Sequence, residues 1–95
     1  MSAYWINTFT ALRDHERLER YAAIAGPAMI AAGGRFLARG NPAFVFEDAT
    51  PLRTTLIEFP CVEAARSAYE SPRYREALAV LGDAATREIR IIDGI

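Results

Sequence analysis

The chain has 95 residues and a mass of 10.5 kDa, which suits one small domain spanning residues 1–95. Hydrophobic residues make up 52% of the chain, which is high for so small a domain. The hydrophobic residues that the core does not need suggest a surface that binds a partner. The 11 cations and 12 carboxylates leave a net charge of −1 and are mixed along the chain. Because no basic stripe or polybasic patch stands out, we expect neither nucleic-acid nor membrane partners.

Residue usage excludes several further chemistries. Every cation is arginine, so Schiff-base chemistry and the usual P-loop phosphate site, which need lysine, are excluded. With one histidine (His15) and one cysteine (Cys61), we expect no metal site, no cofactor and no internal disulfide. The chain begins without signal-peptide features and has no run approaching the roughly 20 apolar residues that span a bilayer. A cytoplasmic location is therefore expected, and the alanine- and arginine-rich composition indicates a bacterial source.

The first half of the chain predicts a strand, a helix and a second strand. Residues 4–11 alternate as a strand, with Trp5 and Phe9 sharing a face with Asn7. Asp14 is a good N-cap for a helix whose apolar stripe runs to residue 32. Pro27 lacks the amide that a helix interior uses, so a kink or a break is expected there.

The next stretch predicts two strands joined by a turn. Residues 35–39 alternate as the second strand, and residues 43–47 could resume it after a bulge. Residues 48–51 carry a turn signal, and residues 53–59 are typical of a third strand.

The last third of the chain predicts two helices and a strand. Residues 62–70 form a short amphipathic helix, and Ser71 with Pro72 starts another that Gly82 ends. Residues 86–92 alternate as the final strand.

The resulting order is β-α-β-β-α-β, which predicts an α+β fold. Right-handed crossovers place both helical units on one face of a four-stranded antiparallel sheet, the ferredoxin-like arrangement. The strands carry apolar side chains on both faces, for example Leu56 opposite Ile57. The face without helices therefore needs cover, and a two-fold homodimer, sheet against sheet, is the simplest cover.

The sequence resembles the bacterial domain-of-unknown-function 1330 family over essentially its whole length. The residues that carry the resemblance are Tyr4-Trp5, Gly33-Gly34-Arg35-Phe36-Leu37 with Arg39-Gly40, Ile57-Glu58-Phe59-Pro60, Ala64-Ala65-Arg66, Tyr69 with Ser71-Pro72 and Tyr74, and Asp93-Gly94. The resemblance implies the dimeric α+β barrel superfamily and no established activity. Relatives at superfamily level include cofactor-free monooxygenases, haem proteins and isomerases, among which fold analogy does not choose.

Arg35, Arg39 and Glu58 are the best polar cluster for a site. Regular alternation puts Arg35 and Arg39 on one face, about 13 Å apart at their backbones. A hairpin turn at residues 48–51 would pair Glu58 near residues 40–41, within reach of Arg39. One interpretation is an arginine fork for a carboxylate, with Glu58 as orienting group or general base. The other is an ion pair that fixes strand register or lies in a dimer interface.

Tyr74 is the fourth candidate for a ligand pocket. It lies in the first turn of the helix that Ser71 caps, where free amides and the helix dipole favour an anion. Trp5, Tyr69 and Tyr74 could line a pocket between helices and sheet, although inward aromatic residues are more often core. His15 is expected to be exposed and Cys61 structural.

These observations support three hypotheses for function. The first is a homodimer that binds a small anionic or aromatic molecule through Arg35, Arg39, Glu58 and Tyr74. The second is a cofactor-independent monooxygenase- or isomerase-type enzyme with Glu58 as base. The third is a structural dimer without a small-molecule site, and the sequence leaves open whether the protein is an enzyme.

Overall fold

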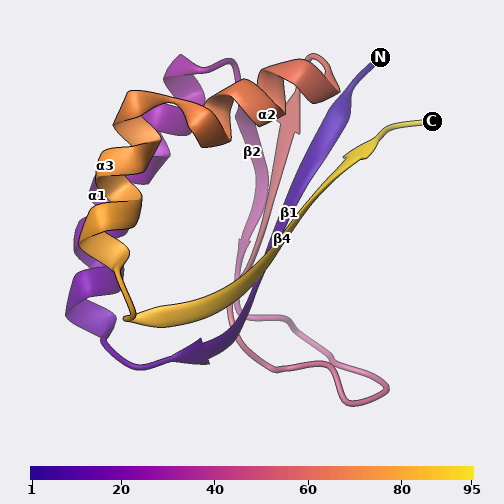
Figure 1. Ribbon diagram of the computed structural model, residues 1–95. Coiled ribbons are helices and arrows are strands. Elements are labelled where there is room, and N and C mark those ends of the chain that lie inside the picture. Colours follow the sequence, from indigo (N-terminus) through magenta and orange to yellow (C-terminus); the bar gives the residue numbers. More distant parts are fainter.

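The computed structural model describes residues 1–95 as a four-stranded sheet covered on one side by helices (Figure 1). The elements in chain order are β1 (Ala3–Leu12), α1 (His15–Ala31), β2 (Arg35–Gly40), β3 (Thr54–Phe59), α2 (Val62–Glu70), α3 (Pro72–Leu81) and β4 (Ala85–Asp93). This confirms the α+β, ferredoxin-like order, with the second helical unit divided into α2 and α3 as Ser71-Pro72 predicts.

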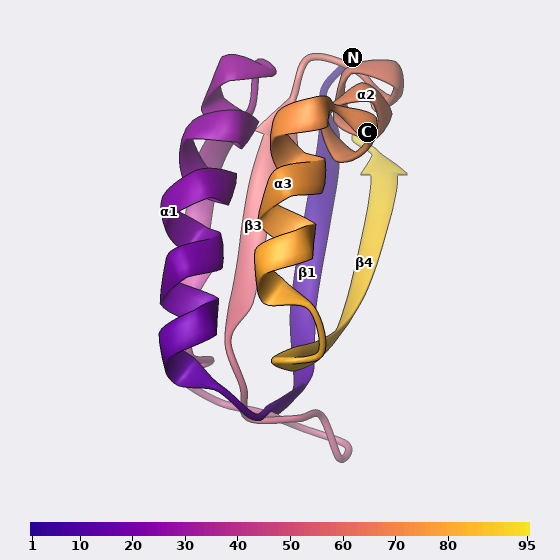
Figure 2. The same ribbon diagram turned by 60° about the vertical axis from the view of Figure 1, so that its left-hand side comes forward.

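The sheet has the strand order β2-β3-β1-β4, and every neighbouring pair is antiparallel. In Figure 2, α1 lies over β2 and β3, whereas α3 lies over the centre of the sheet and leaves β4 at its side. The opposite face carries no helix, and we call it the open face (Figure 1). The two chain ends lie at the same end of the sheet. No helix here combines the length and the apolar character needed to cross a membrane.

Helix α1 begins as the sequence predicts but does not break. The Oδ1 atom of Asp14 accepts a hydrogen bond from the amide of Arg17 at 3.1 Å, which caps the helix. The predicted break at Pro27 is wrong, since one helix runs from His15 to Ala31. Pro27 is exposed and removes a single backbone hydrogen bond, while buried Ala28 and Met29 directly after it hold the helix against the sheet.

The core lies between the helices and the inner face of the sheet. Alternate residues of β1 are buried there, and Trp5, Asn7 and Phe9 share the helix-covered face as predicted. The largest side chains with less than 2% exposure are Trp5, Tyr74, Phe59 and Met29. Trp5 and Tyr74 pack edge to face, with ring centroids 5.5 Å apart.

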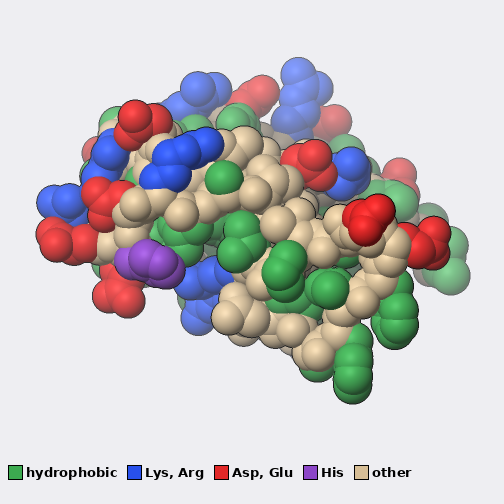
Figure 3. All heavy atoms as spheres, turned by 90° about the horizontal axis from the view of Figure 1, so that it is seen from below, with side chains coloured by type: hydrophobic (Ala, Val, Ile, Leu, Met, Phe, Trp, Pro, Cys, Tyr) green, Lys and Arg blue, Asp and Glu red, His purple; other side chains and the backbone are tan.

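The segment between β2 and β3 is a loop that projects on the open-face side (Figure 1). The predicted strand at residues 43–47 is wrong, because β3 starts only at Thr54 and these residues have no strand to pair with. Phe44 and Phe46 are 82% and 77% exposed. Figure 3 views the molecule from this end and shows hydrophobic side chains gathered on its surface.

Candidate functional site

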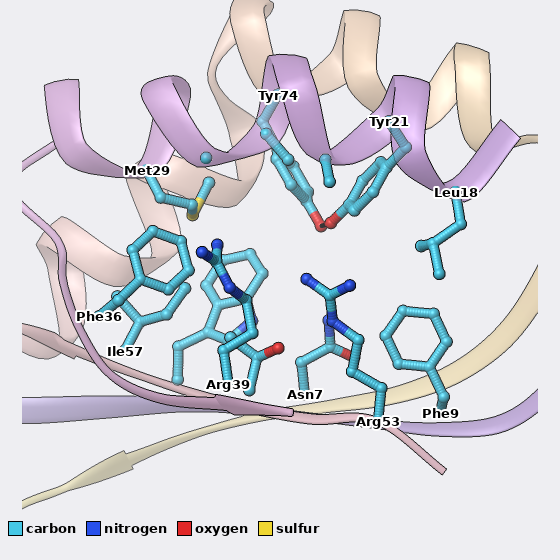
Figure 4. Close-up of a pocket in the computed structure, with 15 residues that line it drawn as sticks. Asn7, Phe9, Leu18, Tyr21, Met29, Phe36, Arg39, Arg53, Ile57 and Tyr74 are labelled. Atoms are coloured by element: carbon cyan, nitrogen blue, oxygen red, sulfur yellow. Dashed lines mark hydrogen bonds between the residues drawn. The ribbon is translucent and has the colours of Figure 1, made fainter. Parts of the chain in front are cut away.

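A cavity lies between α1 and the inner face of the sheet, with Tyr74 of α3 at its roof (Figure 4). The space between its atoms is about 420 Å³ with the mouth included, and the part that admits whole water molecules is about 40 Å³. Its lining residues are Trp5, Asn7, Phe9, Leu18, Tyr21, Ala22, Ala25, Gly26, Met29, Phe36, Arg39, Arg53, Thr55, Ile57 and Tyr74. Most of the wall is apolar, so the few polar groups define its chemistry.

The floor of the cavity holds one polar row that crosses three strands. Arg39 of β2 lies opposite Thr55 of β3, and Thr55 lies opposite Asn7 of β1. Asn7 and Thr55, each 5% exposed, are the buried polar residues of the chain. The neighbouring row is apolar, because Ile57 pairs with Phe36 on one side and Trp5 on the other. A polar stripe therefore crosses an otherwise hydrophobic floor.

A bulge in β2 separates the two arginines that the sequence placed together. Arg35 pairs with Glu58, but the register shifts at Leu37, and Arg39 then pairs with Thr55. The extra residue reverses the alternation, so Arg39 faces the cavity while Arg35 stays on the open face. The predicted shared face of Arg35 and Arg39, and the predicted reach of Glu58 to Arg39, are both wrong.

Arg35 and Glu58 instead form an ion pair between neighbouring strands. Nη2 of Arg35 lies 2.7 Å from Oε1 of Glu58, and Nε of Arg35 donates to the same oxygen at 3.2 Å. This hydrogen bonding lowers the pKa of the Glu58 carboxyl below its usual value. The pair matches the alternative interpretation, an ion pair that fixes strand register or lies in a dimer interface. Glu58 is not among the residues that line the cavity, and hence cannot act as a base within it.

Arg39 and Arg53 point from the sheet into the mouth of the cavity (Figure 4). Neither has a carboxylate partner among the ion pairs of the chain. The Arg39 guanidinium lies 4.7 Å from the centre of the Phe36 ring. Burial, and secondly the charge of Arg39, lower the pKa of Arg53. The mouth therefore holds two cations without an ion-pair partner, and the Glu19 carboxylate nearby raises the pKa of Arg53 only as a smaller effect.

Arg53 is a site residue that the sequence analysis missed, although a signal was available. It lies two residues before Thr55 and four before Ile57, and strand alternation puts all three on one face. The Phe9 amide donates to the Arg53 carbonyl at 3.0 Å, which extends the pairing of β1 with β3 by one step.

Three polar side chains meet above the floor. The hydroxyl oxygens of Tyr21 and Tyr74 lie 2.7 Å apart, and Nη1 of Arg87 donates to them at 2.8 and 3.2 Å. Burial raises the pKa of the Tyr74 hydroxyl above its ordinary value, with the neighbouring Tyr21 as the next cause. We call these three residues the tyrosine–arginine cluster. The sequence analysis did not predict Tyr21 and Arg87 as site residues, because no local sequence pattern shows that α1, α3 and β4 meet at this point.

The side chain of Asn7 has an unsatisfied hydrogen-bond acceptor. Its Oδ1 is buried and has no hydrogen-bond partner. An unsatisfied buried acceptor costs about 1–3 kcal/mol of stability. Asn7 lies on the floor in the same row as Thr55 and Arg39, so its unpaired oxygen belongs to the cavity.

Of the four predicted pocket residues, the structure brings Arg39 and Tyr74 to one cavity and leaves Arg35 and Glu58 on the open face. The Tyr69 ring packs against Trp5 but does not line the cavity. It lines a separate groove between α3 and β4. His15 and Cys61 are exposed, and neither lines the cavity.

Comparison with known proteins adds the fold and the family context. The model of a family described as a domain of unknown function, DUF1330, matches residues 2–95. A search of curated protein sequences finds no match.

Solved structures resemble this one over almost the whole chain at low sequence identity. A dimeric ferredoxin-like protein of unknown function from Jannaschia has a TM-score of 0.78 at 12% identity, with 99% of this chain and 100% of that chain covered. A protein of unknown function from Rhodopseudomonas palustris has a TM-score of 0.72 at 18% identity, covering 99% and 82%. SnoaB, a cofactor-independent oxygenase from Streptomyces nogalater, has a TM-score of 0.68 at 17% identity, covering 99% and 93%. These similarities show a shared fold.

Proposed function

Because the chain belongs to the DUF1330 family, whose name carries no function, we propose a function from the geometry of the cavity. The cavity binds a small organic anion with an aromatic or apolar body, and the protein acts as a homodimer. The observation that carries this proposal is the pair Arg39 and Arg53, two cations without a carboxylate partner at the mouth of an apolar cavity.

Charge favours an anion at this mouth. Burial and mutual repulsion both disfavour the charged form of Arg53, as the lowered pKa records. An anionic group placed between Arg39 and Arg53 would offset both effects. Guanidinium groups also match a carboxylate in shape, since their parallel N–H donors can hold both of its oxygens.

The walls favour an apolar or aromatic body behind that anionic group. Met29, Phe36 and Ile57 form one end of the cavity, and Phe9 with Leu18 forms the other (Figure 4). The part of the cavity that admits whole water molecules is about 40 Å³ and has room for only a few of them, so a ring needs the mouth as well. Because no ion pair holds Arg39 or Arg53, both side chains can move outward to admit it.

Binding of benzoate and of its uncharged analogue benzamide tests the proposal. Trp5 is the single tryptophan and lines the cavity, so its fluorescence reports occupancy directly. Benzoate should bind more tightly than benzamide, and Arg39→Gln or Arg53→Gln should each weaken benzoate about 10- to 100-fold. Arg35→Gln is the matched control, because it removes one charge from the same strand on the open face. Equal binding of benzamide, or an equal loss in Arg35→Gln, would overturn the proposal.

The homodimer uses the open face. Ile6 and Leu56 pair across β1 and β3 there, with Ala38 next to Leu56 in the same row. Arg90 continues this row on β4, and Ile92, 56% exposed, lies two residues further along β4. An apolar centre of this kind on an uncovered sheet is typical of an interface. The structural neighbour from Jannaschia is a dimer, which supports the same assembly here.

A second candidate function is cofactor-independent oxygenation, supported by the likeness to SnoaB. The two mouth arginines and a tyrosine hydroxyl would stabilise the phenolate or enolate form of a bound ligand. Such an anion can give an electron to O2 directly. Glu58 is not its base, since it lies outside the cavity and no carboxylate lines the wall. An oxygen electrode tests this function: catalytic O2 uptake with an acidic phenol supports it, and binding without uptake leaves the binding function alone.

A further inference from the structure

The hydrogen-bonding groups of the cavity specify a ligand that has both an anionic group and a hydrogen-bond donor. Resting on the proposed anion site, we infer that the ligand is a hydroxylated aromatic acid whose hydroxyl donates to Asn7. The inference depends on which groups in the cavity can donate and which can accept.

Most of the free polar groups in the cavity are donors, and the Thr55 hydroxyl can both donate and accept. The guanidinium groups of Arg39 and Arg53 have no acceptor atom. Tyr21 and Tyr74 have two hydroxyl protons between them, and one is used in the 2.7 Å bond that joins their oxygens. Arg87 donates to both oxygens and takes neither proton. One tyrosine proton is therefore left without an acceptor in the chain and is available to an anionic oxygen.

Asn7 supplies the exception, a buried acceptor without a donor. Its side chain is 5% exposed and lines the cavity, and its Oδ1 has no partner although the cavity also holds the donors of Arg39 and Arg53 (Figure 4). An anionic oxygen cannot satisfy this atom, because two acceptors repel. An O–H group on the ligand can. A benzoate without such a group would leave the Asn7 Oδ1 without a hydrogen bond, and burying an unpaired acceptor costs free energy.

The spacing of the row places the two ligand groups apart. Arg39 and Asn7 are on β2 and β1, separated by β3, so their backbones are about 10 Å apart at the usual strand spacing. A carboxylate at Arg39 and a hydroxyl at Asn7 therefore belong on non-adjacent ring carbons. This geometry selects 3- or 4-hydroxybenzoate over 2-hydroxybenzoate.

Calorimetric titration of the wild-type protein with five acids tests the inference. The acids are benzoate, the three hydroxybenzoates, and the methoxy analogue of whichever hydroxybenzoate binds best. The 3- or 4-isomer should bind about tenfold more tightly than benzoate, and replacing its hydroxyl by methoxy should remove the gain, because an ether cannot donate.

Two variants connect the gain to Asn7. Asn7→Leu keeps the size of the side chain and should reduce the ratio of the two affinities, hydroxybenzoate over benzoate, to about one. Thr8→Val is the control, since Thr8 is the next residue of β1 and faces the opposite side of the sheet. It should leave the ratio unchanged.

The outcomes separate this inference from the proposed function. Failure of every acid to bind overturns the anion site itself. Benzoate binding as tightly as all hydroxybenzoates overturns only the hydroxyl inference and assigns Asn7 to a bound water. A methoxy analogue that binds as tightly as its hydroxybenzoate would also overturn the hydroxyl inference. This comparison uses only the wild-type protein, so it does not depend on the folding of a variant.

Discussion

At the scale of single residues, the tyrosine–arginine cluster holds a half-buried cation without a carboxylate partner. Arg87 extends from β4, donates to the hydroxyls of Tyr21 and Tyr74, and lies 5.0 Å from the centre of the Tyr21 ring. Hydroxyl oxygens and the electron-rich ring face stabilise its charge in place of water. The cluster therefore holds Tyr74 in a fixed position above the polar row.

This environment predicts a loss of stability at alkaline pH. The folded-state pKa of Tyr74 is raised by burial above the unfolded value of about 10, so the native state holds its proton more tightly. The contribution is present below pH 10 and is lost as the pH rises above it, because only the unfolded chain then releases the proton. Urea denaturation from pH 8 to 11 should show stability falling above pH 10.

Tyr74→Phe identifies the residue responsible. The variant should lose about 1 kcal/mol at pH 8, since a buried hydrogen-bonding group is removed, and its alkaline fall should be shallower. Tyr4→Phe is the control, because the Tyr4 hydroxyl contacts Glu58 on the open face at 3.4 Å. An alkaline fall in Tyr74→Phe as steep as that of the wild type would contradict this explanation.

At the scale of elements, the sequence predicts strands more reliably than the faces of their side chains. In β1 regular alternation correctly places Trp5, Asn7 and Phe9 inward. In β2 the same rule fails, because the bulge at Leu37 arises from pairing with β3 and no glycine or proline at that position indicates it. Two of the four predicted pocket residues, Arg35 and Glu58, therefore lie on the open face and not in the cavity. The one extra residue at the bulge, Leu37, causes this error.

The helix cap at Ser71 connects local structure to the cavity. The Ser71 Oγ accepts from the Tyr74 amide at 3.3 Å and donates to the Ala68 carbonyl at 2.8 Å, so it joins the end of α2 to the start of α3. Ser71→Ala should cost about 1 kcal/mol in urea denaturation. It should also weaken benzoate binding, because Tyr74 lies in the first turn of α3.

Ser67→Ala provides the matched control for this cap. Ser67 is exposed within α2, and its substitution should change the free energy of unfolding by less than about 0.5 kcal/mol. Equal effects of the two alanine variants would show that the Ser71 cap contributes nothing specific.

At the scale of the whole molecule, strand order and helix placement follow from the sequence without the structure. Element order, handedness and short connections leave the ferredoxin-like arrangement as the simplest solution, and the structure has it. The cavity could be predicted less well. Its polar groups come from β1, β2, β3, α1 and α3, so their meeting depends on register and packing across long sequence separations.

The proposed assembly gives a further prediction. Leu56→Arg puts a charge at the centre of the open face and should convert a dimer to a monomer in light scattering, because an unpaired charge in an interface is strongly unfavourable. Ala79→Arg, on the exposed side of α3, should remain dimeric. The cavity lies on the helix-covered face, opposite the open face, so the Leu56→Arg monomer should still bind benzoate. A dimeric Leu56→Arg would contradict the open-face interface.

The central claim is that an organic anion enters the cavity between Arg39 and Arg53. The most direct test is a crystal structure of the protein soaked with 4-bromobenzoate, in which anomalous scattering locates the bromine. We expect a bromine peak among the apolar residues of the cavity, with the carboxylate density at Arg39 and Arg53. A peak on the open face beside Arg35, with the cavity empty, would contradict the claim.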